Sequence, residues 1–180
     1  MSCTGVLLVG GASRRFGSPK AFAVLEGETL AERAWRMLGE VCDECLAFGK
    51  VTDRLAFPFE VRDDGFDVRA PIAGVVAGLR AATHEVSLFL PVDTPLVRAA
   101  SLRLLAERCR DAAVPPTGPL PGAYARSALP VLERRLAAGE LALWAALADL
   151  DSVVVDLDEA ELVNVNTLSD LERLQTRRQR

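Results

Sequence analysis

The segment Thr4-Gly-Val-Leu-Leu-Val9 is a short apolar run that ends at Gly10-Gly11. A strand buried on both faces reads this way, because neither of its sides meets water. We therefore expect a central strand of a parallel sheet. A Gly-, Ser- and Arg-rich loop, residues 10–20, leads from this strand to Thr29–Gly39, where apolar side chains recur on one side of a helical pattern. Strand, loop and helix in this order favour an α/β protein.

Strand-like and helical patterns alternate along the rest of the chain, and most of the strands are apolar throughout. We expect strands at Cys45–Phe48, Phe59–Arg62, Ser87–Val92, Ala113–Pro115, Ala123–Tyr124 and Ser152–Leu157. We expect helices from Pro71 onward and at Ala99–Arg110, Ser127–Ala138, Leu141–Leu150 and Leu168–Arg177. This succession predicts a sandwich around a mostly parallel sheet, with residues 1–180 as one domain. The Pro-rich stretch Pro115–Pro121 is expected to be an active-site loop.

The composition excludes several classes of protein. Of the 180 residues, 50% are apolar and 26% charged, which is enough apolar material for a core and argues against disorder. The net charge of −4 argues against a nucleic-acid partner, which needs clustered Lys and Arg. No apolar stretch approaches the roughly 20 residues that cross a bilayer, and the first apolar run lacks the features of a secretory leader. We expect a cytoplasmic protein without a membrane partner.

The four cysteines include one Cys-x-x-Cys pair, Cys42 and Cys45. A zinc site needs two further ligands, yet no second pair exists and His84 is the only histidine. We expect reduced thiols near a helix end and a strand start rather than a metal or redox site.

The residues just after each apolar strand are the candidates for ligand binding, because ligands of open α/β sheets collect at the carboxyl ends of the strands. After the first strand, the loop from Gly10 to Lys20 combines glycines with Arg and Lys, a composition suited to phosphate. It is neither a Walker loop nor a dinucleotide fingerprint. An ordinary Gly-rich loop with solvated Arg side chains is the alternative interpretation.

Asp93 follows the apolar strand Ser87–Val92 and is the second candidate. Mg²⁺ prefers one or two carboxylates together with phosphate oxygens and water, so a strand-end Asp beside a phosphate loop suits it. The alternative is a helix cap, a position that Asp also favours. The lone His84 is expected to be a surface residue, which leaves no nucleophile–His pair to compete with this site.

Four segments together resemble the nucleotidyltransferases that complete the molybdenum cofactor, in particular the molybdenum cofactor guanylyltransferases. The first, Leu8-Val-Gly-Gly-Ala-Ser-Arg-Arg-Phe-Gly-Ser-Pro-Lys-Ala21, is similar to the family signature L-x-G-G-x-S-x-R-x-G-x-x-K-A. The others are Asp64 with Pro71-Ile-Ala-Gly74, Leu90-Pro-Val-Asp-Thr-Pro-Leu96 and Asn164-Val-Asn-Thr-Leu-Ser-Asp-Leu171. The resemblance covers nearly the whole chain.

The resemblance implies a Rossmann-like three-layer α/β/α fold that transfers GMP from GTP to molybdopterin with Mg²⁺ and releases pyrophosphate. Carried over position by position, it makes Arg15, Lys20 and Asp93 catalytic. Asp93 would hold Mg²⁺ as well as nucleotide, and Arg15 and Lys20 would hold the phosphates. Residues implied to bind nucleotide or substrate are Leu8, Val9, Gly10, Gly11, Ser13, Lys20, Asp64, Asp93, Asn164 and Asn166. Proteins of molybdenum cofactor biosynthesis and molybdoenzyme chaperones would be its protein partners.

Three alternatives to the guanylyltransferase stay open. They are a cytidylyltransferase acting on the same pterin, a sugar-phosphate nucleotidyltransferase, and a noncatalytic nucleotide-binding adaptor. Gly10-Gly11 resembles the guanylyl version, so we expect GTP to be preferred to CTP. Lys20 and Lys50 are the only lysines, and Lys50 lies outside every matched motif. We expect Lys20 to need its ammonium group and Lys50 to be dispensable.

Overall fold

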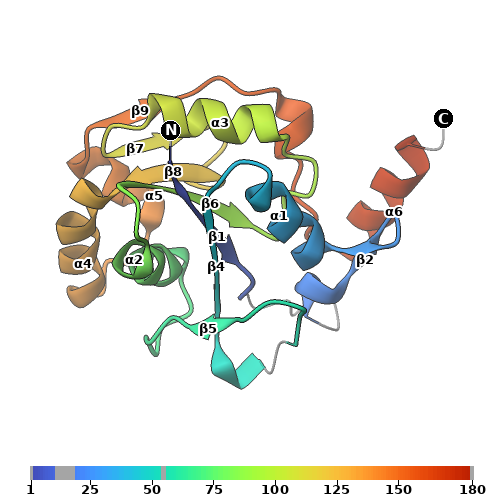
Figure 1. Ribbon diagram of the computed structural model, residues 1–180, viewed down its shortest axis with the longest axis horizontal. Helices are drawn as coiled ribbons and strands as arrows, with labels where there is room; N and C mark the ends of the chain where they lie inside the picture. The colour runs from blue at the N-terminus through green and yellow to red at the C-terminus, as the bar shows by residue number, and fades with distance from the viewer. Residues whose placement is uncertain (1, 11–18, 54–55, 179–180) are drawn as a thin grey trace.

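A mostly parallel sheet forms the centre of the protein, which we describe from a computed structural model of residues 2–10, 19–53 and 56–178 (Figure 1). The strands of this sheet are β1 (Thr4–Leu8), β4 (Glu44–Gly49), β5 (Arg62–Asp63), β6 (Val86–Pro91), β7 (Ala112–Val114), β8 (Gly122–Ala125) and β9 (Ser152–Val154). Within the described residues these seven strands lie in the order β5-β4-β1-β6-β8-β7-β9. Only β8 is antiparallel to its neighbours, β6 and β7; the other neighbouring strands of this sheet are parallel.

Helices cover both faces of the sheet (Figure 1). One face packs against α1 (Leu30–Gly39) and α3 (Ala99–Arg108), and the other against α2 (Pro71–Ala81), α4 (Leu129–Ala137) and α5 (Leu143–Ala146). The last helix, α6 (Leu168–Arg178), lies beside β2 (Val24–Leu25), where Gln175 Nε2 donates a hydrogen bond to the Val24 carbonyl at 3.2 Å. The predicted three-layer α/β/α sandwich is confirmed. In the part of the chain that the structure describes, no helix has the length and apolar character to cross a membrane.

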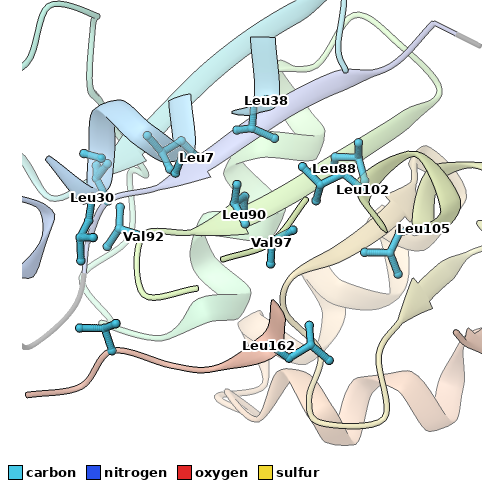
Figure 2. Packing of buried hydrophobic residues seen from close by; sticks show 14 of the residues in the cluster. Leu7, Leu30, Leu38, Leu88, Leu90, Val92, Val97, Leu102, Leu105 and Leu162 are labelled. Atoms are coloured by element: carbon cyan, nitrogen blue, oxygen red, sulfur yellow. The ribbon is translucent and has the colours of Figure 1, made fainter. Parts of the chain in front are cut away.

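Neighbouring residues of the central strand pack into different layers, because side chains alternate along a strand. Leu7 belongs to the core formed with Leu38 of α1 and Leu102 of α3, all three fully buried (Figure 2). Val6 belongs instead to the core on the other face, with Ile72 of α2. Burial of each such side chain contributes about 1.5–3 kcal/mol. An apolar run without alternation therefore fits a strand with a helical layer on each side.

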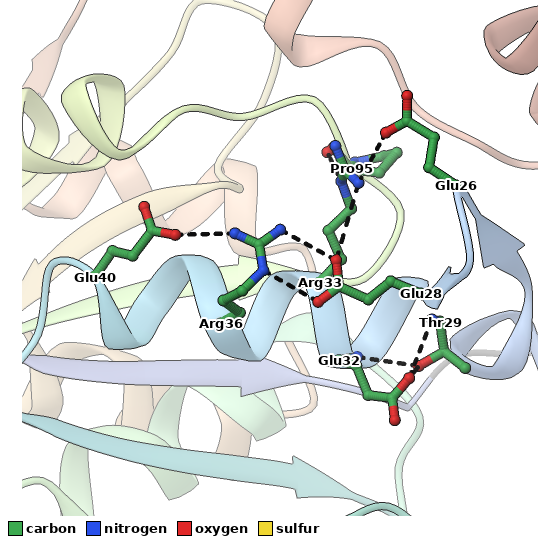
Figure 3. Close-up of polar contacts among 8 residues, drawn as sticks. All are labelled: Glu26, Glu28, Thr29, Glu32, Arg33, Arg36, Glu40 and Pro95. Atoms are coloured by element: carbon green, nitrogen blue, oxygen red, sulfur yellow. Dashed lines mark hydrogen bonds and ion pairs between the residues drawn. The ribbon is translucent and has the colours of Figure 1, made fainter.

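Helix α1 is capped at its start and also contacts the loop that follows β6 (Figure 3). Its N-cap is Thr29, whose Oγ1 accepts from the Glu32 amide at 3.2 Å while the Thr29 amide donates to Glu32 Oε2 at 3.1 Å. This capping box contributes about 1 kcal/mol. One residue further along, Arg33 Nε donates to the Pro95 carbonyl at 2.9 Å. Helix α1 is thus tied to the loop that begins with Asp93.

A small hairpin and several single turns complete the described structure. The hairpin pairs β2 with β3 (Glu28–Thr29) through Glu26 and Gly27, whose φ values of 55° and 84° are typical of a two-residue hairpin turn. The 3₁₀ turns are η1 (Lys20–Phe22), η2 (Val51–Asp53), η3 (Arg126–Ala128), η4 (Leu147–Asp149) and η5 (Glu159–Leu162).

Four expected elements differ from those in the structure. The strand expected at Phe59–Arg62 is wrong: Phe59 stacks on Trp35 at 4.3 Å between ring centroids, and pairing begins only at Arg62. The helix expected at Leu141–Leu150 is shorter, since α5 gives way to the 3₁₀ turn η4. The helix expected from Ser127 begins as η3 and becomes α4 at Leu129, where Pro130 occupies the first turn. The last strand ends at Val154 instead of Leu157.

Candidate functional site

A cavity of about 530 Å³ opens at the carboxyl ends of the parallel strands, where ligands of open α/β sheets bind. The residues that line it lie at or after the ends of β1, β4, β5 and β6, in the first turn of α2, in the loop between β7 and β8, or in the segment before α6. They are Leu8, Gly10, Phe48, Gly49, Lys50, Asp64, Arg69, Ala70, Pro71, Gly74, Pro91, Asp93, Thr117, Gly118, Pro119, Leu120 and Asn164. The Pro-rich stretch expected to be an active-site loop supplies four of these residues, Thr117–Leu120.

Lys20, Asp93 and Asn166 meet at one end of the site. Lys20 Nζ lies 3.3 Å from Asp93 Oδ2 and donates to Asn166 Oδ1 at 2.9 Å. The Lys20 side chain is 14% exposed and that of Asp93 30% exposed, so solvent still reaches the carboxylate. Asp93 and Asn166 lie 73 and 146 positions from Lys20 along the chain, yet the fold brings all three together. Lys20 and Asp93 are the cation and the carboxylate that the sequence analysis predicts to be catalytic.

The segment that carries the two asparagines is held in place at both ends. The Val165 amide donates to the Asp93 carbonyl at 2.8 Å, which joins this segment to the loop after β6. On the other side, Asp170 Oδ2 accepts from the amides of Asn166 and Thr167 at 3.0 and 2.9 Å. Hydrogen bonds from Thr167 and from the Asn166 amide lower the pKa of Asp170. Asn164 lines the cavity, and Asn166 lies beside it in the chain, where its Oδ1 accepts from Lys20.

Lys50 and Asp64 form a second ion pair in the same cavity. Lys50 Nζ lies 2.5 Å from Asp64 Oδ1 and also donates to the Phe66 carbonyl. Their side chains are 11% and 9% exposed. The Phe66 amide donates to the same Oδ1 at 3.0 Å, and the Asp64 amide donates to the Gly49 carbonyl at 3.2 Å. The sequence analysis assigns Asp64 to nucleotide binding.

Lys50 and Arg69 are charged residues of the cavity that the sequence analysis did not place there. Lys50 lies outside every matched motif and is expected to be dispensable, yet it lines the cavity. No motif contains it, but one signal pointed to it: it is one of only two lysines among 21 basic residues.

Close backbone packing explains the glycines on this edge. A Cβ added to Gly74 would lie 2.8 Å from Leu8 Cδ2, so a larger residue where α2 crosses the end of β1 would displace the Leu8 side chain. Gly10 lies against Gly49, with a built Cβ 3.4 Å from the Gly49 Cα. Leu8 and Gly10 line the cavity, whereas the Val9 side chain is buried in the core. Only the backbone of Val9 is therefore placed to meet a ligand.

Three predicted site residues fall outside the described part of the chain. They are Gly11, Ser13 and Arg15.

Asp93 does not cap a helix, which removes one of its two interpretations. The next helix, α3, begins at Ala99 and has Arg98 at its N-cap. Among the described residues, Asp93 Oδ1 accepts no hydrogen bond, while Oδ2 is paired with Lys20. One carboxylate oxygen is thus available to a cation at the cavity.

The thiols and the histidine lie away from the cavity, toward the amino ends of the strands. Cys42 follows α1 and lies with its Sγ 3.4 Å from that of Cys3. Burial raises the pKa of Cys45 to about 11, which keeps this thiol protonated at neutral pH. His84 is half-buried and its Nδ1 lies 3.0 Å from Thr4 Oγ1, so this histidine is held against the first strand.

The comparisons with known proteins agree with this fold. The class is that of the nucleotidyltransferases: a structure of the molybdopterin-guanine dinucleotide biosynthesis protein A from Archaeoglobus fulgidus superposes with a TM-score of 0.80 at 26% identity, covering 96% of this chain and 97% of that one. The 2-C-methyl-D-erythritol 4-phosphate cytidylyltransferase of Thermus thermophilus, at 19% identity, covers 98% of both chains with a TM-score of 0.74 and shares the fold.

The MobA-like NTP transferase domain matches residues 5–153, and the chain belongs to this family. A molybdenum cofactor guanylyltransferase from Desulfosudis oleivorans is 32% identical over 94% of this chain and 93% of its own length. A molybdenum cofactor guanylyltransferase from Pseudomonas syringae is 31% identical over 92% of this chain and 89% of its own length.

Proposed function

We propose that this protein is a molybdenum cofactor guanylyltransferase, which transfers GMP from GTP to molybdopterin and releases pyrophosphate. The observation that carries the proposal is the meeting of Lys20, Asp93 and Asn166 at the cavity, in a chain 32% identical to a guanylyltransferase of this kind. The product would be the molybdopterin guanine dinucleotide. We further propose that residues 1–180 act as one domain, because the central sheet takes strands from Thr4 to Val154.

The reaction asks for charge neutralisation more than for a strong base. The terminal phosphate of molybdopterin attacks the α-phosphorus of GTP, the bond from that phosphorus to the bridging oxygen breaks, and pyrophosphate leaves. Both the attacking group and the leaving group are anionic, so cations and in-line positioning lower the barrier. We assign Lys20 to the phosphates, since its ammonium lies beside Asp93, which lines the cavity. Arg15 is proposed as a second cation on the same phosphates.

The donor chemistry at Asp93 fits Mg²⁺. A single carboxylate suits this ion, which takes its other ligands from phosphate oxygens and water. Asp93 Oδ1 has no hydrogen-bond partner among the described residues, so it would hold the ion while Oδ2 stays paired with Lys20. When bound, Mg²⁺ would neutralise charge on the phosphate oxygens. Lys20, in turn, keeps Asp93 in position at the end of β6.

The remaining predicted residues divide between the two substrates. Leu8 and Gly10, at the end of β1, and Asp64, after β5, line the part of the cavity that we assign to the nucleotide. On the family resemblance alone, we also assign Val9, Gly11 and Ser13 to the nucleotide. The segment that carries Asn164 and Asn166 contacts Asp93 and Lys20, and we assign both asparagines to molybdopterin. As a cytoplasmic enzyme of this biosynthesis, it would exchange substrate and product with other biosynthetic proteins and with molybdoenzyme chaperones.

A pyrophosphate-release assay tests the proposal. The protein is incubated with MgCl₂, molybdopterin and each nucleoside triphosphate in turn, and pyrophosphate is quantified enzymatically. We expect release with GTP that requires both Mg²⁺ and molybdopterin. Release with GTP that is independent of the pterin would identify a different acceptor, and no release with any triphosphate would favour a noncatalytic binding protein.

A further inference from the structure

The buried pair Lys50–Asp64 is not explained by stability alone. A buried ion pair is costly to desolvate, and apolar residues of similar size are often equally or more stabilising in its place. This pair is nearly enclosed, with side chains 11% and 9% exposed, yet both residues line the cavity. A function at the cavity is a better reason for a charged pair in this position.

The hydrogen bonds use one carboxylate oxygen of Asp64 and leave the other available. Asp64 Oδ1 accepts from Lys50 Nζ at 2.5 Å and from the Phe66 amide at 3.0 Å. Among the described residues, Oδ2 accepts no hydrogen bond. Because Lys50 Nζ also donates to the Phe66 carbonyl, the ammonium joins the end of β4 to the loop after β5. The carboxyl group is therefore held in one orientation, with Oδ2 as the acceptor left for a ligand.

Strand order places this pair at the opposite end of the cavity from Asp93. Lys50 follows β4 and Asp64 follows β5, whereas Asp93 follows β6, and β1 lies between β4 and β6. With strands about 4.8 Å apart, β4 and β6 are separated by about 10 Å. A nucleotide whose phosphates lie at Lys20 and Asp93 would extend its nucleoside toward Asp64. An anionic carboxylate repels phosphate but accepts hydrogen bonds from the N–H groups of a base or the hydroxyls of a ribose.

We propose that Lys50 is a positioning residue: it fixes Asp64 so that Oδ2 accepts a hydrogen bond from the nucleoside of the bound nucleotide. The inference rests on the proposed function, because it needs a nucleotide in this cavity. It adds a residue outside the matched motifs, and it says that Lys50 acts on the nucleotide only through Asp64.

A double-mutant cycle tests this inference. GTP dissociation constants are measured by calorimetry without molybdopterin for the unmodified protein, Lys50→Met, Asp64→Asn and the double variant, and KM and kcat are measured with molybdopterin present. We expect each single variant to weaken GTP binding about tenfold and to raise KM with little change in kcat. The double variant should bind GTP no more weakly than Asp64→Asn alone, because the two residues act as one unit.

Two comparisons separate positioning from a purely structural role. Arg110→Met removes an ion pair with Asp151 whose side chains are 66% and 60% exposed, and it should leave GTP binding unchanged. Lys50→Arg keeps the charge and the fold but changes the donor geometry, so we expect GTP binding to weaken several-fold with an unchanged melting temperature. If Lys50→Met does not fold, the Lys50→Arg variant still tests the inference.

The source of the hydrogen-bond donor is found with nucleotide analogues. If a base N–H reaches Asp64, Lys50→Met narrows the difference in affinity between GTP and ITP. If a ribose hydroxyl reaches Asp64, Lys50→Met narrows the difference in affinity between GTP and 2′,3′-dideoxy-GTP. Additive losses in the cycle, or unchanged GTP binding by both Lys50 variants, would overturn the inference. Absence of GTP binding by the unmodified protein would contradict the proposed function itself, and this inference with it.

Discussion

Lys20 Nζ lies 3.3 Å from Asp93 Oδ2, although 73 residues separate the two along the chain. Each residue follows a central strand: Lys20 comes after β1 and its Gly-rich loop, and Asp93 is the second residue after β6. Because β1 and β6 are parallel neighbours, both loops meet at the same edge of the sheet. The pair is therefore a direct consequence of the strand order, and the cation reaches the carboxylate that we assign to Mg²⁺.

Replacing Asp93 by Ala should nearly abolish turnover while the fold is kept. The substitution removes the carboxylate that we assign to the metal and leaves Lys20 without its partner, whereas a side chain 30% exposed adds little to the core. Steady-state pyrophosphate release across a range of MgCl₂ concentrations measures the effect, with circular dichroism as the control for folding. A folded variant with near-normal, Mg²⁺-dependent turnover would remove Asp93 as the ligand.

Lys20→Arg should lose most of the activity even though the charge is kept. A guanidinium is larger, planar and forked, and the Lys20 ammonium lies between Asp93 and Asn166 with only 14% of its side chain exposed. Lys50→Arg, which the sequence alone suggests as a harmless control, is unsuitable because Lys50 lines the cavity. The matched control is Arg110→Lys, at an exposed ion pair elsewhere. Equal turnover in the Lys20 and Arg110 variants would place Lys20 outside the reaction.

Glu161 should stabilise the protein less as the pH falls. Its carboxylate accepts from Arg98 Nε at 2.6 Å and from Ser101 Oγ at 2.7 Å, which joins η5 to the start of α3. Burial acts to raise the pKa of Glu161, but the hydrogen bonds from Arg98 and Ser101 outweigh it, so the pKa is lowered from 4.5. The stabilisation is therefore complete above the unfolded-state pKa and is lost as the pH falls through the lower, folded-state pKa.

Urea unfolding of Glu161→Gln checks this. We expect the free energy of unfolding to fall by about 1–3 kcal/mol at pH 7, because the substitution weakens the buried hydrogen bonds that Glu161 accepts from a charged partner. The difference from the unmodified protein should shrink as the pH is lowered below about 4.3, where Glu protonates in the unfolded chain. A difference that is constant with pH would show that the ionised form of Glu161 does not contribute.

Gly78→Ala should destabilise the packing of α2 on the sheet. A Cβ at this position would lie 2.6 Å from Phe89 Cε1 and 2.9 Å from Val6 Cγ1, both fully buried. Such overpacking costs about 1–3 kcal/mol. Gly39→Ala, at the end of α1, is the matched control, because nothing lies within 4 Å of its added Cβ. In chemical denaturation, the free energy of unfolding should be lower for Gly78→Ala than for Gly39→Ala. Equal values would contradict the packing described for α2.

The sequence was sufficient for the central strands and for bringing Lys20 and Asp93 to the same edge of the sheet, whereas Asn166 was placed there only by the family resemblance. Residues after apolar parallel strands must converge on one edge, so motifs far apart in the chain could be placed together before the structure was known. The Lys50–Asp64 end was not predictable in the same way. It depends on the two-residue strand β5, whose register pairs Gly49 with Asp63. Phe59, where the sequence suggests that the strand begins, stacks its ring on Trp35 instead.

The choice of nucleotide tests the central claim most directly. The protein is given equal concentrations of GTP and CTP with MgCl₂ and limiting molybdopterin, and the dinucleotide products are identified and quantified by mass spectrometry. We expect the guanine dinucleotide to exceed the cytosine dinucleotide at least tenfold, because each buried polar group left unpaired by the wrong base costs about 1–3 kcal/mol. Equal amounts of the two products, or an excess of the cytosine dinucleotide, would contradict the assignment as a guanylyltransferase.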